Sequence, residues 1–164
     1  MKRLLMILCI LVPALSVAQN KEKETIGKLL DNWHQAAADA QLDAYFQVLA
    51  PDAIYIGTDA TEHWSVDKFR KFCKPYFHNK KTWDFKALER HVFLDETGEL
   101  AWFDELLDTQ MKICRGSGVL RKEKDGWKIV HYVLSMTVPN DNVEPVVKIK
   151  TPIEDAYIKT LQQK

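Results

Sequence analysis

Four side chains that can bind a ligand or transfer a proton lie close together near residue 60. In the segment GTDATEHW, residues 57–64, Asp59 and Glu62 supply carboxylates, His63 an imidazole and Trp64 an indole. Carboxylates and imidazoles move protons or orient ligands, whereas an indole offers apolar contact. A plain surface turn needs none of these groups. The segment therefore predicts the rim of a pocket, with Trp64 as its wall and the two acids as polar contacts.

Further candidates for ligand contact are spread along the chain. The full set consists of Trp33, Tyr55, Asp59, Glu62, Trp64, Trp102, Asp104, Arg115 and His131. Several have a purely structural alternative. Trp64 and His131 can be core side chains, and Arg115 can be an exposed strand end. Glu62 and Asp104 can be solvated acids, so the sequence leaves both interpretations open.

No complete catalytic or metal-binding set accompanies these residues, and no cofactor is expected. The chain has no His-Glu-x-x-His, no Cys-x-x-Cys and no zinc spacing. Ser117 and Ser135 have no identifiable activating base. The Gly-Ser-Gly at 116–118 lacks the lysine and the following helix of a phosphate loop, so it more simply marks a bulge or a close approach of chain segments.

The first 18 residues have the pattern of a signal peptide. Residues 2–3 are basic, residues 4–15 form an apolar run too short to span a bilayer, and residues 16–18 put small side chains at the two positions that a signal peptidase recognises. We therefore expect a mature chain that begins at Gln19. Such a protein is exported, periplasmic or secreted, and keeps no membrane segment.

Charge and cysteine content narrow the class of protein further. The 164 residues carry 23 basic and 23 acidic side chains, and removing residues 1–18 leaves a net charge of −2. This balance gives no electrostatic basis for binding nucleic acid or an anionic membrane. The mature chain keeps Cys73 and Cys114, which allow one disulfide, although two buried thiols are the favoured interpretation.

Helices are predicted in the first half of the mature chain. Apolar residues in segment 25–40 recur at every third or fourth position, which indicates an amphipathic helix. A short helix over 42–50 and a strand over 53–57 follow. Ser65 is a good N-cap for a third helix, and Pro75 should kink or end that helix near its last turn.

Long strands are predicted in the second half, over residues 83–95, 99–110, 111–123 and 127–138. In the last strand, alternation puts Ile129 and His131 on one face and Tyr132 and Leu134 on the other. Both faces are largely apolar, so one should take the helices and the other a partner subunit or the C-terminal tail. We expect a homodimer packed through this outer face. The tail, residues 141–164, should wrap the domain or fray, with a short helix from about Glu154.

Helices followed by long antiparallel strands define an α+β domain. The chain resembles the nuclear-transport-factor-two-like superfamily, in its SnoaL-like branch, in the segments LLDNWHQAAADAQLDAYFQVLAPDAIYIGTD, EHWSVDKFRKF, AWFDELL and GSGVLRKEKDGWKIVHYVLS. The resemblance covers about residues 24–138 of a domain that we place at 19–140. It implies N-terminal helices packed in a strongly bent antiparallel sheet, a cone-shaped, cystatin-like α+β barrel with an apolar pocket inside.

The same superfamily contains ketosteroid isomerases, whose chemistry can be compared residue by residue. Those enzymes use a tyrosine on the first helix, a carboxylate base at the end of the first strand and a protonated acid on a later strand. The resemblance places Trp33, Gly57 and Gly118 at or near these positions. None of the three can supply the required acid or base, so steroid-type isomerase activity is not expected.

Three functions remain open. The first is an exported protein that binds a small apolar or amphipathic molecule, with a few acids and an arginine to orient it. The second is an enzyme of the same fold, of isomerase, hydratase or cyclase type, with Asp59, Glu62, Asp104 or His131 as acid or base. The third is a dimerisation module whose pocket is filled by its own side chains. Binding is the preferred hypothesis because no catalytic set is complete.

Overall fold

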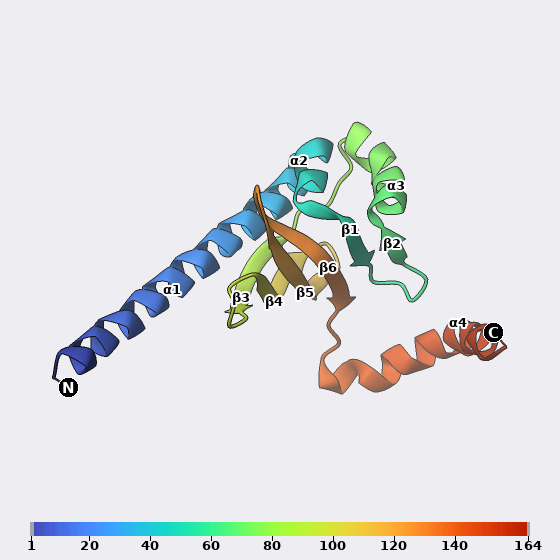
Figure 1. The fold of residues 1–164 in the computed structure, drawn as a ribbon. Coiled ribbons are helices and arrows are strands. Elements are labelled where there is room, and N and C mark those ends of the chain that lie inside the picture. Colours follow the sequence, from blue (N-terminus) through green and yellow to red (C-terminus); the bar gives the residue numbers. More distant parts are fainter. Residues whose placement is uncertain (1, 164) are drawn as a thin grey trace.

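The computed structural model describes residues 2–163, and it describes side chains from Gln19 onward. Figure 1 shows a helical N-terminal half, a curved sheet and a separate C-terminal helix. In chain order the elements are α1 (Lys2–Ala38), α2 (Leu42–Gln47), β1 (Leu49–Ile56), β2 (His63–Ser65), α3 (Val66–His78), β3 (Lys86–Leu94), β4 (Leu100–Thr109), β5 (Lys112–Glu123), β6 (Gly126–Met136), the 3-10 helix η1 (Asn140–Asn142) and α4 (Val143–Gln162).

The strands form one six-stranded sheet in the order β2-β1-β6-β5-β4-β3. All neighbours are antiparallel except β1 and β6, which pair in parallel, so the sheet is mixed and not wholly antiparallel as expected. Helices α1, α2 and α3 lie on its inner face, where the buried core is found. The α+β class with N-terminal helices against a strongly curved sheet is confirmed.

The predicted helix over 25–40 is the second half of α1, which ends at Ala38. Ala40 has φ +55, and the Gln41 N–H donates to the Ala36 carbonyl at 2.8 Å, a left-handed helix end of the common kind. Of the expected signal peptide, residues 2–18 lie in the first half of α1, and its side chains are outside the described residues. Within the described residues, no helix combines the length and apolarity needed to cross a membrane.

The predicted boundary around Pro51 is shifted by a strand that begins early. Helix α2 already ends at Gln47, and β1 starts at Leu49, which pairs with Ile129 of β6. The register between the two strands shifts between Leu49 and Ile54, and Pro51 is exposed within this irregular stretch. Because proline has no N–H to donate to a neighbouring strand, it is tolerated at such an irregularity.

A bulge in β6 reverses the predicted faces of that strand. Val119 of β5 pairs with His131, but the next residue, Leu120, pairs with Ile129, so Val130 is the extra residue. A bulge changes which face the following side chains occupy. Ile129 and Tyr132 are therefore both buried on the inner face, and the prediction that Ile129 and His131 share a face is wrong.

The two glycines of the Gly-Ser-Gly segment allow close packing on the inner face. A Cβ on Gly118 would lie 2.6 Å from the His131 carbonyl oxygen and 2.7 Å from Phe103 Cε1. A Cβ on Gly116 would lie 2.5 Å from the Tyr132 hydroxyl oxygen. The segment runs without a register shift through β5 at these positions, so it marks a close approach and not a bulge.

The C-terminal extension differs most from the expected structure. Instead of a short helix from Glu154, α4 begins at Val143 and spans 20 residues, none of them buried. Its one substantial neighbour is η1, and Figure 1 shows it apart from the sheet. The sequence did not predict the first part of this helix because it contains two prolines. Pro145 lies in the first turn, where a missing N–H costs little, while Pro152 lies in the interior.

Candidate functional site

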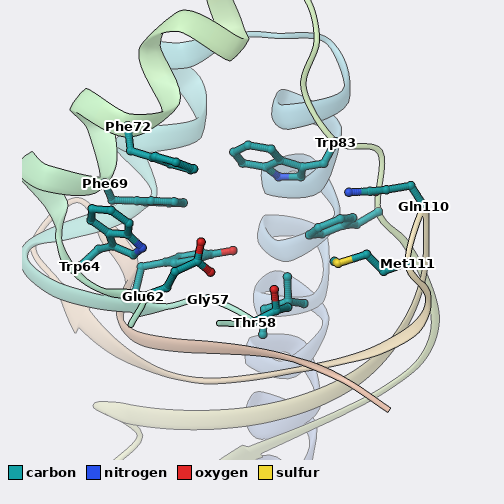
Figure 2. Close-up of a pocket in the computed structure, with 12 residues that line it drawn as sticks. Gly57, Thr58, Glu62, Trp64, Phe69, Phe72, Trp83, Gln110 and Met111 are labelled. Atoms are coloured by element: carbon teal, nitrogen blue, oxygen red, sulfur yellow. The ribbon is translucent and has the colours of Figure 1, made fainter. Parts of the chain in front are cut away.

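A cavity of about 200 Å³ lies between α3, the end of β1, the segment before β3 and the β4–β5 turn. Figure 2 shows the side chains that point toward it from these elements. Twelve residues line it: Tyr55, Gly57, Thr58, Glu62, Trp64, Phe69, Phe72, Trp83, Phe85, Gln110, Met111 and Leu134. Half of them are aromatic, so flat aromatic rings form much of the surface offered to a ligand, beside polar groups.

The aromatic walls are held by stacking between elements. Tyr55 of β1 stacks on Phe69 of α3, with ring centroids 3.9 Å apart and planes 16° apart. Trp64 of β2 stacks on Phe72 of the same helix at 5.2 Å. The spacing of Phe69 and Phe72 puts both rings on one side of α3. Offset aromatic pairs of this kind contribute about 0.5–1.5 kcal/mol beyond area burial, so this side of the cavity is preformed.

Glu62 is the only charged side chain among the twelve, and Figure 2 shows its carboxylate directed into the cavity. The turn that carries it is closed by backbone bonds from Gly57 N–H to the Glu62 carbonyl at 3.0 Å and from Glu62 N–H to the Asp59 carbonyl at 2.9 Å. One carboxylate oxygen, Oε2, also accepts the Asp59 N–H at 3.2 Å. The other keeps its capacity to accept a hydrogen bond from a ligand.

Gly57 leaves the space that this carboxylate occupies. A Cβ built on Gly57 would overlap Glu62 Oε2 and lie 2.9 Å from Glu62 Cδ. The backbone at Gly57 does not have a positive φ, so the glycine is needed for room and not for conformation. The sequence resemblance put the carboxylate base of the isomerases at Gly57, and in the structure a carboxylate from five residues further on lies beside that position.

Asp59 stabilises the turn and does not line the cavity. Its Oδ1 accepts from the Thr61 N–H at 2.8 Å and from the Thr61 hydroxyl at 2.6 Å. These hydrogen bonds from Thr61 lower the pKa of Asp59 below its ordinary value. The two acids of the opening segment thus have separate roles, with Asp59 holding the turn and Glu62 facing the cavity.

A buried polar network lies behind the aromatic wall. Glu105 is fully buried, and its Oε1 accepts from His34 Nε2 at 2.8 Å while its Oε2 accepts from Arg90 Nε at 2.9 Å. Arg90 Nη1 donates to Asp31 at 2.7 Å and to the Gly27 carbonyl at 2.9 Å. Burial disfavours the charged guanidinium, but Glu105 and Asp31 outweigh it and raise the pKa of Arg90. The network joins α1 to β3 and β4.

Two tyrosines connect this network to the cavity. Tyr55 lines the cavity, and its ring lies 5.3 Å from that of Tyr132. Burial raises the pKa of both phenols, so both hydroxyls stay protonated at neutral pH. Among the described buried atoms, the Tyr132 hydroxyl has no hydrogen-bond partner. His34 is separated from the cavity by Phe85, whose ring centroid lies 6.0 Å from the imidazole.

Three of the nine candidate residues from the sequence line the cavity: Tyr55, Glu62 and Trp64. Trp33 is fully buried behind it, stacked on Tyr45 at 5.1 Å and edge-on to Tyr132 at 4.8 Å. Trp33 therefore belongs to the core that supports the wall and does not reach a ligand in the cavity.

The structure does not place the remaining four candidates at the cavity, which corrects that expectation. Trp102 and Asp104 alternate with the buried Phe103 and Glu105 on β4, so they lie on the outer face. Paired residues of neighbouring strands lie on the same face of a sheet. Arg115 on β5 and His131 on β6 therefore also lie on the outer face. For His131 the physical reason is the bulge at Val130.

Sequence reasoning also missed residues that form the site. Trp83 and Phe85 were assigned to a strand, but β3 begins at Lys86 and both rings come from the segment before it. Gln110 and Met111 were assigned to strand ends and form a turn. The signal for Glu105 was present: with Ala101, Phe103 and Leu107 it shares one alternating face of β4, on which it is the single charged residue.

The described side chains hold no group of three or more His, Cys, Asp or Glu arranged to bind a metal ion. Cys73 and Cys114 are both buried and unpaired. Burial raises the pKa of Cys73 to about 12, so its thiol is protonated and unreactive at neutral pH. The chemistry of the site therefore comes down to aromatic contact, the Glu62 carboxylate and neutral hydrogen-bonding groups.

Comparison with known proteins identifies the family. The profile of the SnoaL-like domain matches residues 26–139, which is most of the chain, and the chain belongs to this family. The neighbours among solved structures are described as having NTF2-like and cystatin-like folds. The matched range contains the whole sheet and excludes α4.

Three solved structures illustrate the likeness. An NTF2-like protein of unknown function from Pseudomonas putida KT2440 is 16% identical, with 76% of this chain and 92% of that chain covered and a TM-score of 0.62. A candidate dehydratase of the NTF2-like family from Streptomyces avermitilis is 13% identical, with coverage of 74% and 99% and a TM-score of 0.64. A candidate aromatic ring hydroxylase from Novosphingobium aromaticivorans is 18% identical, with coverage of 73% and 91% and a TM-score of 0.63.

At these identities the likeness establishes the fold and no activity. No curated protein matches the chain significantly. The family and fold are those of a small-molecule-binding or enzymatic domain, and the choice between the two depends on the cavity itself.

Proposed function

We propose that the chain is an exported protein that binds a small, flat aromatic molecule carrying a hydroxyl or amino group. The observation that carries this proposal is the aromatic cavity with one carboxylate, Glu62, directed into it. Aromatic walls select flat apolar ligands, and a single charged acceptor selects one that can donate a hydrogen bond.

The size of the cavity limits the ligand to one or two rings. At about 200 Å³ it is smaller than the roughly 300–1,000 Å³ of pockets for drug-sized ligands. Thr58 and Gln110 add neutral polar groups to the lining, whereas no cationic side chain lies on it. An anionic ligand would face the Glu62 carboxylate unpaired, so a neutral or cationic donor fits better.

Replacing Glu62 with glutamine should weaken binding of donor ligands selectively. We expect the affinity for 1-naphthol to fall about ten- to a hundredfold, because a charge-assisted hydrogen bond contributes about 1.5–3 kcal/mol. The affinity for naphthalene, which has the same rings and no donor, should stay within about twofold. Trp64 and Trp83 line the cavity, so the change in intrinsic tryptophan fluorescence on titration measures both ligands.

Asp59→Asn is the matched control, because it removes a carboxylate from the same turn but not from the cavity. It should leave both affinities unchanged, although it weakens the turn. Binding of neither probe to the wild-type protein would contradict the proposal. Equal loss of 1-naphthol and naphthalene affinity in Glu62→Gln would show a distorted cavity and remove Glu62 from ligand recognition.

An enzyme that abstracts a proton is the second candidate function. It is favoured by the position of the Glu62 carboxylate beside Gly57, where the resemblance to isomerases placed a carboxylate base. The same variant separates the two functions if the probe is 2-tetralone, an aromatic ketone with exchangeable protons. A catalytic base predicts enzyme-catalysed deuterium uptake from D2O that falls about 10²–10⁴-fold in Glu62→Gln while binding survives. Uptake at the buffer rate in wild type leaves binding as the function.

A dimerisation module without a ligand is the least supported function. That hypothesis needs a pocket filled by the protein's own side chains, whereas the aromatic residues here leave an open cavity. Dimerisation remains compatible with binding, because the strand residues that line the cavity, Tyr55, Trp64 and Leu134, lie on the inner face of the sheet.

Export predicts that the mature protein begins at Gln19. A chain that begins at Gln19 keeps a contact between α1 and the sheet, because Glu22 accepts a hydrogen bond from Trp127 Nε1 at 2.8 Å. The intact mass of protein recovered from the exported fraction measures the start directly. A mass that includes Met1 in that fraction would contradict the signal peptide.

A further inference from the structure

Helix α4 carries an apolar stripe that packs against no other described element of the chain. Val146, Ile149, Ile153 and Tyr157 follow one another at steps of three, four and four residues, so they lie along one side of the helix. Ile149 is 73% exposed and Ile153 75% exposed. A stripe of this kind on a helix of 20 residues is expected to pack against another surface, because helical stability in proteins comes mostly from tertiary packing.

The outer face of the sheet exposes further apolar side chains on which no described residue packs. Phe93 and Trp102 stack across β3 and β4 at 5.7 Å while remaining 41% and 47% exposed. Pairing continues this row from Trp102 to Val119 on β5, and Ile113 lies further along the same strand, 46% exposed. Phe93, Trp102 and Val119 thus form an exposed apolar patch, which usually marks an interaction site, and Ser117 and Arg115 separate it from Ile113.

The two surfaces match in length. Helix α4, with 20 residues, is about 30 Å long, and strands β4 to β6, with 10 to 12 residues, extend about 33–40 Å. Helix on sheet is the arrangement that buries the inner face of this same sheet.

The exit from β6 directs α4 away from its own sheet. The Thr137 N–H and hydroxyl both donate to the Ile113 carbonyl, at 3.2 and 2.7 Å. Pro139 then has a restricted φ of −57, and the Asn142 N–H closes a turn on the Pro139 carbonyl at 2.8 Å, directly before α4. With this exit held by hydrogen bonds and a proline, α4 is directed away from its own sheet, and Figure 1 shows the helix apart from the sheet.

We propose that α4 of one copy packs its Val146–Tyr157 stripe on the outer sheet face of a second copy, so that two chains exchange their C-terminal helices. One exchange buries both unpartnered surfaces of both chains. A symmetric contact of this kind is closed and self-limiting, so it gives a dimer and not a fibre. It also specifies what covers the outer face, for which the sequence left a partner subunit and the tail as alternatives.

Cross-linking between two differently labelled chains tests the exchange. One full-length chain carries Ser117→Cys at the centre of the outer face, and the other carries Ala156→Cys beside the stripe together with an affinity tag. Cys9 is replaced by serine in both chains, and the native Cys73 and Cys114 are buried and should not react. After mixing, a short bismaleimide should join a tagged chain to an untagged chain. Cross-links between two Ala156→Cys chains, or none between the mixed chains, would overturn the proposal.

A chain that carries both cysteines distinguishes exchange from folding back. Exchange predicts a cross-linked dimer, whereas a helix lying on its own sheet gives an internally linked monomer and overturns the proposal. Light scattering at micromolar concentration supplies the independent measurement. Ile149→Glu with Ile153→Glu should raise the dimer dissociation constant at least about tenfold, since two carboxylates would enter an apolar contact. Lys148→Glu on the polar side should not, and a dimer that persists in the double variant would mean that α4 is not its contact.

Discussion

Glu105→Gln should lower the free energy of unfolding by about 3–5 kcal/mol, although it preserves the shape of the side chain. Both oxygens of Glu105 accept hydrogen bonds, one from His34 and one from Arg90. An amide has one oxygen, so its NH2 group must face one of these donors. Arg90 is then left with only the more exposed Asp31 as a charged partner. Urea unfolding followed by tryptophan fluorescence measures the loss.

Asp104→Asn is the matched control, because it makes the same chemical change one residue earlier on the same strand. Asp104 is about half exposed and pairs with His91 at 3.1 Å on the outer face. Exposed pairs contribute about 0–1 kcal/mol, so this variant should unfold close to wild type. Similar losses for the two variants would mean that the buried network does not carry the stability assigned to it.

This pair of residues also shows what the sequence could specify about the fold. The sequence predicted β4 as a strand, and alternation then leaves only two ways for it to face. Strand identity follows from local pattern, but the choice of face depends on which side the helices cover. On β6 alternation predicted the wrong face for part of the strand, because the bulge at Val130 adds one residue and shifts the alternation after it. The α+β class was predicted correctly although the faces of individual strands were not, because the class depends only on the order of helices and strands.

The sequence predicted only those residues of the candidate site that lie close to one another along the chain. Tyr55, Glu62 and Trp64 lie within ten residues, and the strand and turn that hold them bring them together. Trp83, Gln110 and Met111 come from connections distant in sequence, and nothing in their own segments indicates that they meet α3. Loop conformation is decided by such tertiary contacts. Sequence could therefore locate one wall of the cavity but not the opposite one.

The first part of the C-terminal helix, before Glu154, was missed for a different reason. Two prolines within nine residues normally argue against a helix, and their effect on propensity outweighed the apolar spacing between them. Pro145 falls in the first turn, where the missing N–H has no partner in any case, and Pro152 alone lies in the interior. Whether a proline argues against a helix thus depends on where the helix begins, and the sequence has no clear signal for a start at Val143.

The largest steric effect is expected for Gly118→Ala, with a loss of about 3 kcal/mol in the free energy of unfolding, at the upper end of the ~1–3 kcal/mol typical of overpacking. The new Cβ would lie 2.6 Å from the backbone carbonyl oxygen of His131 and 2.7 Å from Phe103 Cε1. A side chain can rotate away, but the carbonyl belongs to the neighbouring strand, so β5 and β6 must separate locally. Urea unfolding measures this loss too.

Gly27→Ala tests whether the effect at Gly118 comes from the close approach or from glycine replacement in general. Gly27 lies within α1, and a Cβ there would have no atom within 4 Å. Alanine favours a helix interior over glycine by about 0.5–1 kcal/mol, so this variant should be more stable than wild type. Adding Phe103→Leu to Gly118→Ala should restore little of the loss, because the strand carbonyl remains in place. A full rescue by Phe103→Leu would assign the strain to the ring and contradict the strand approach.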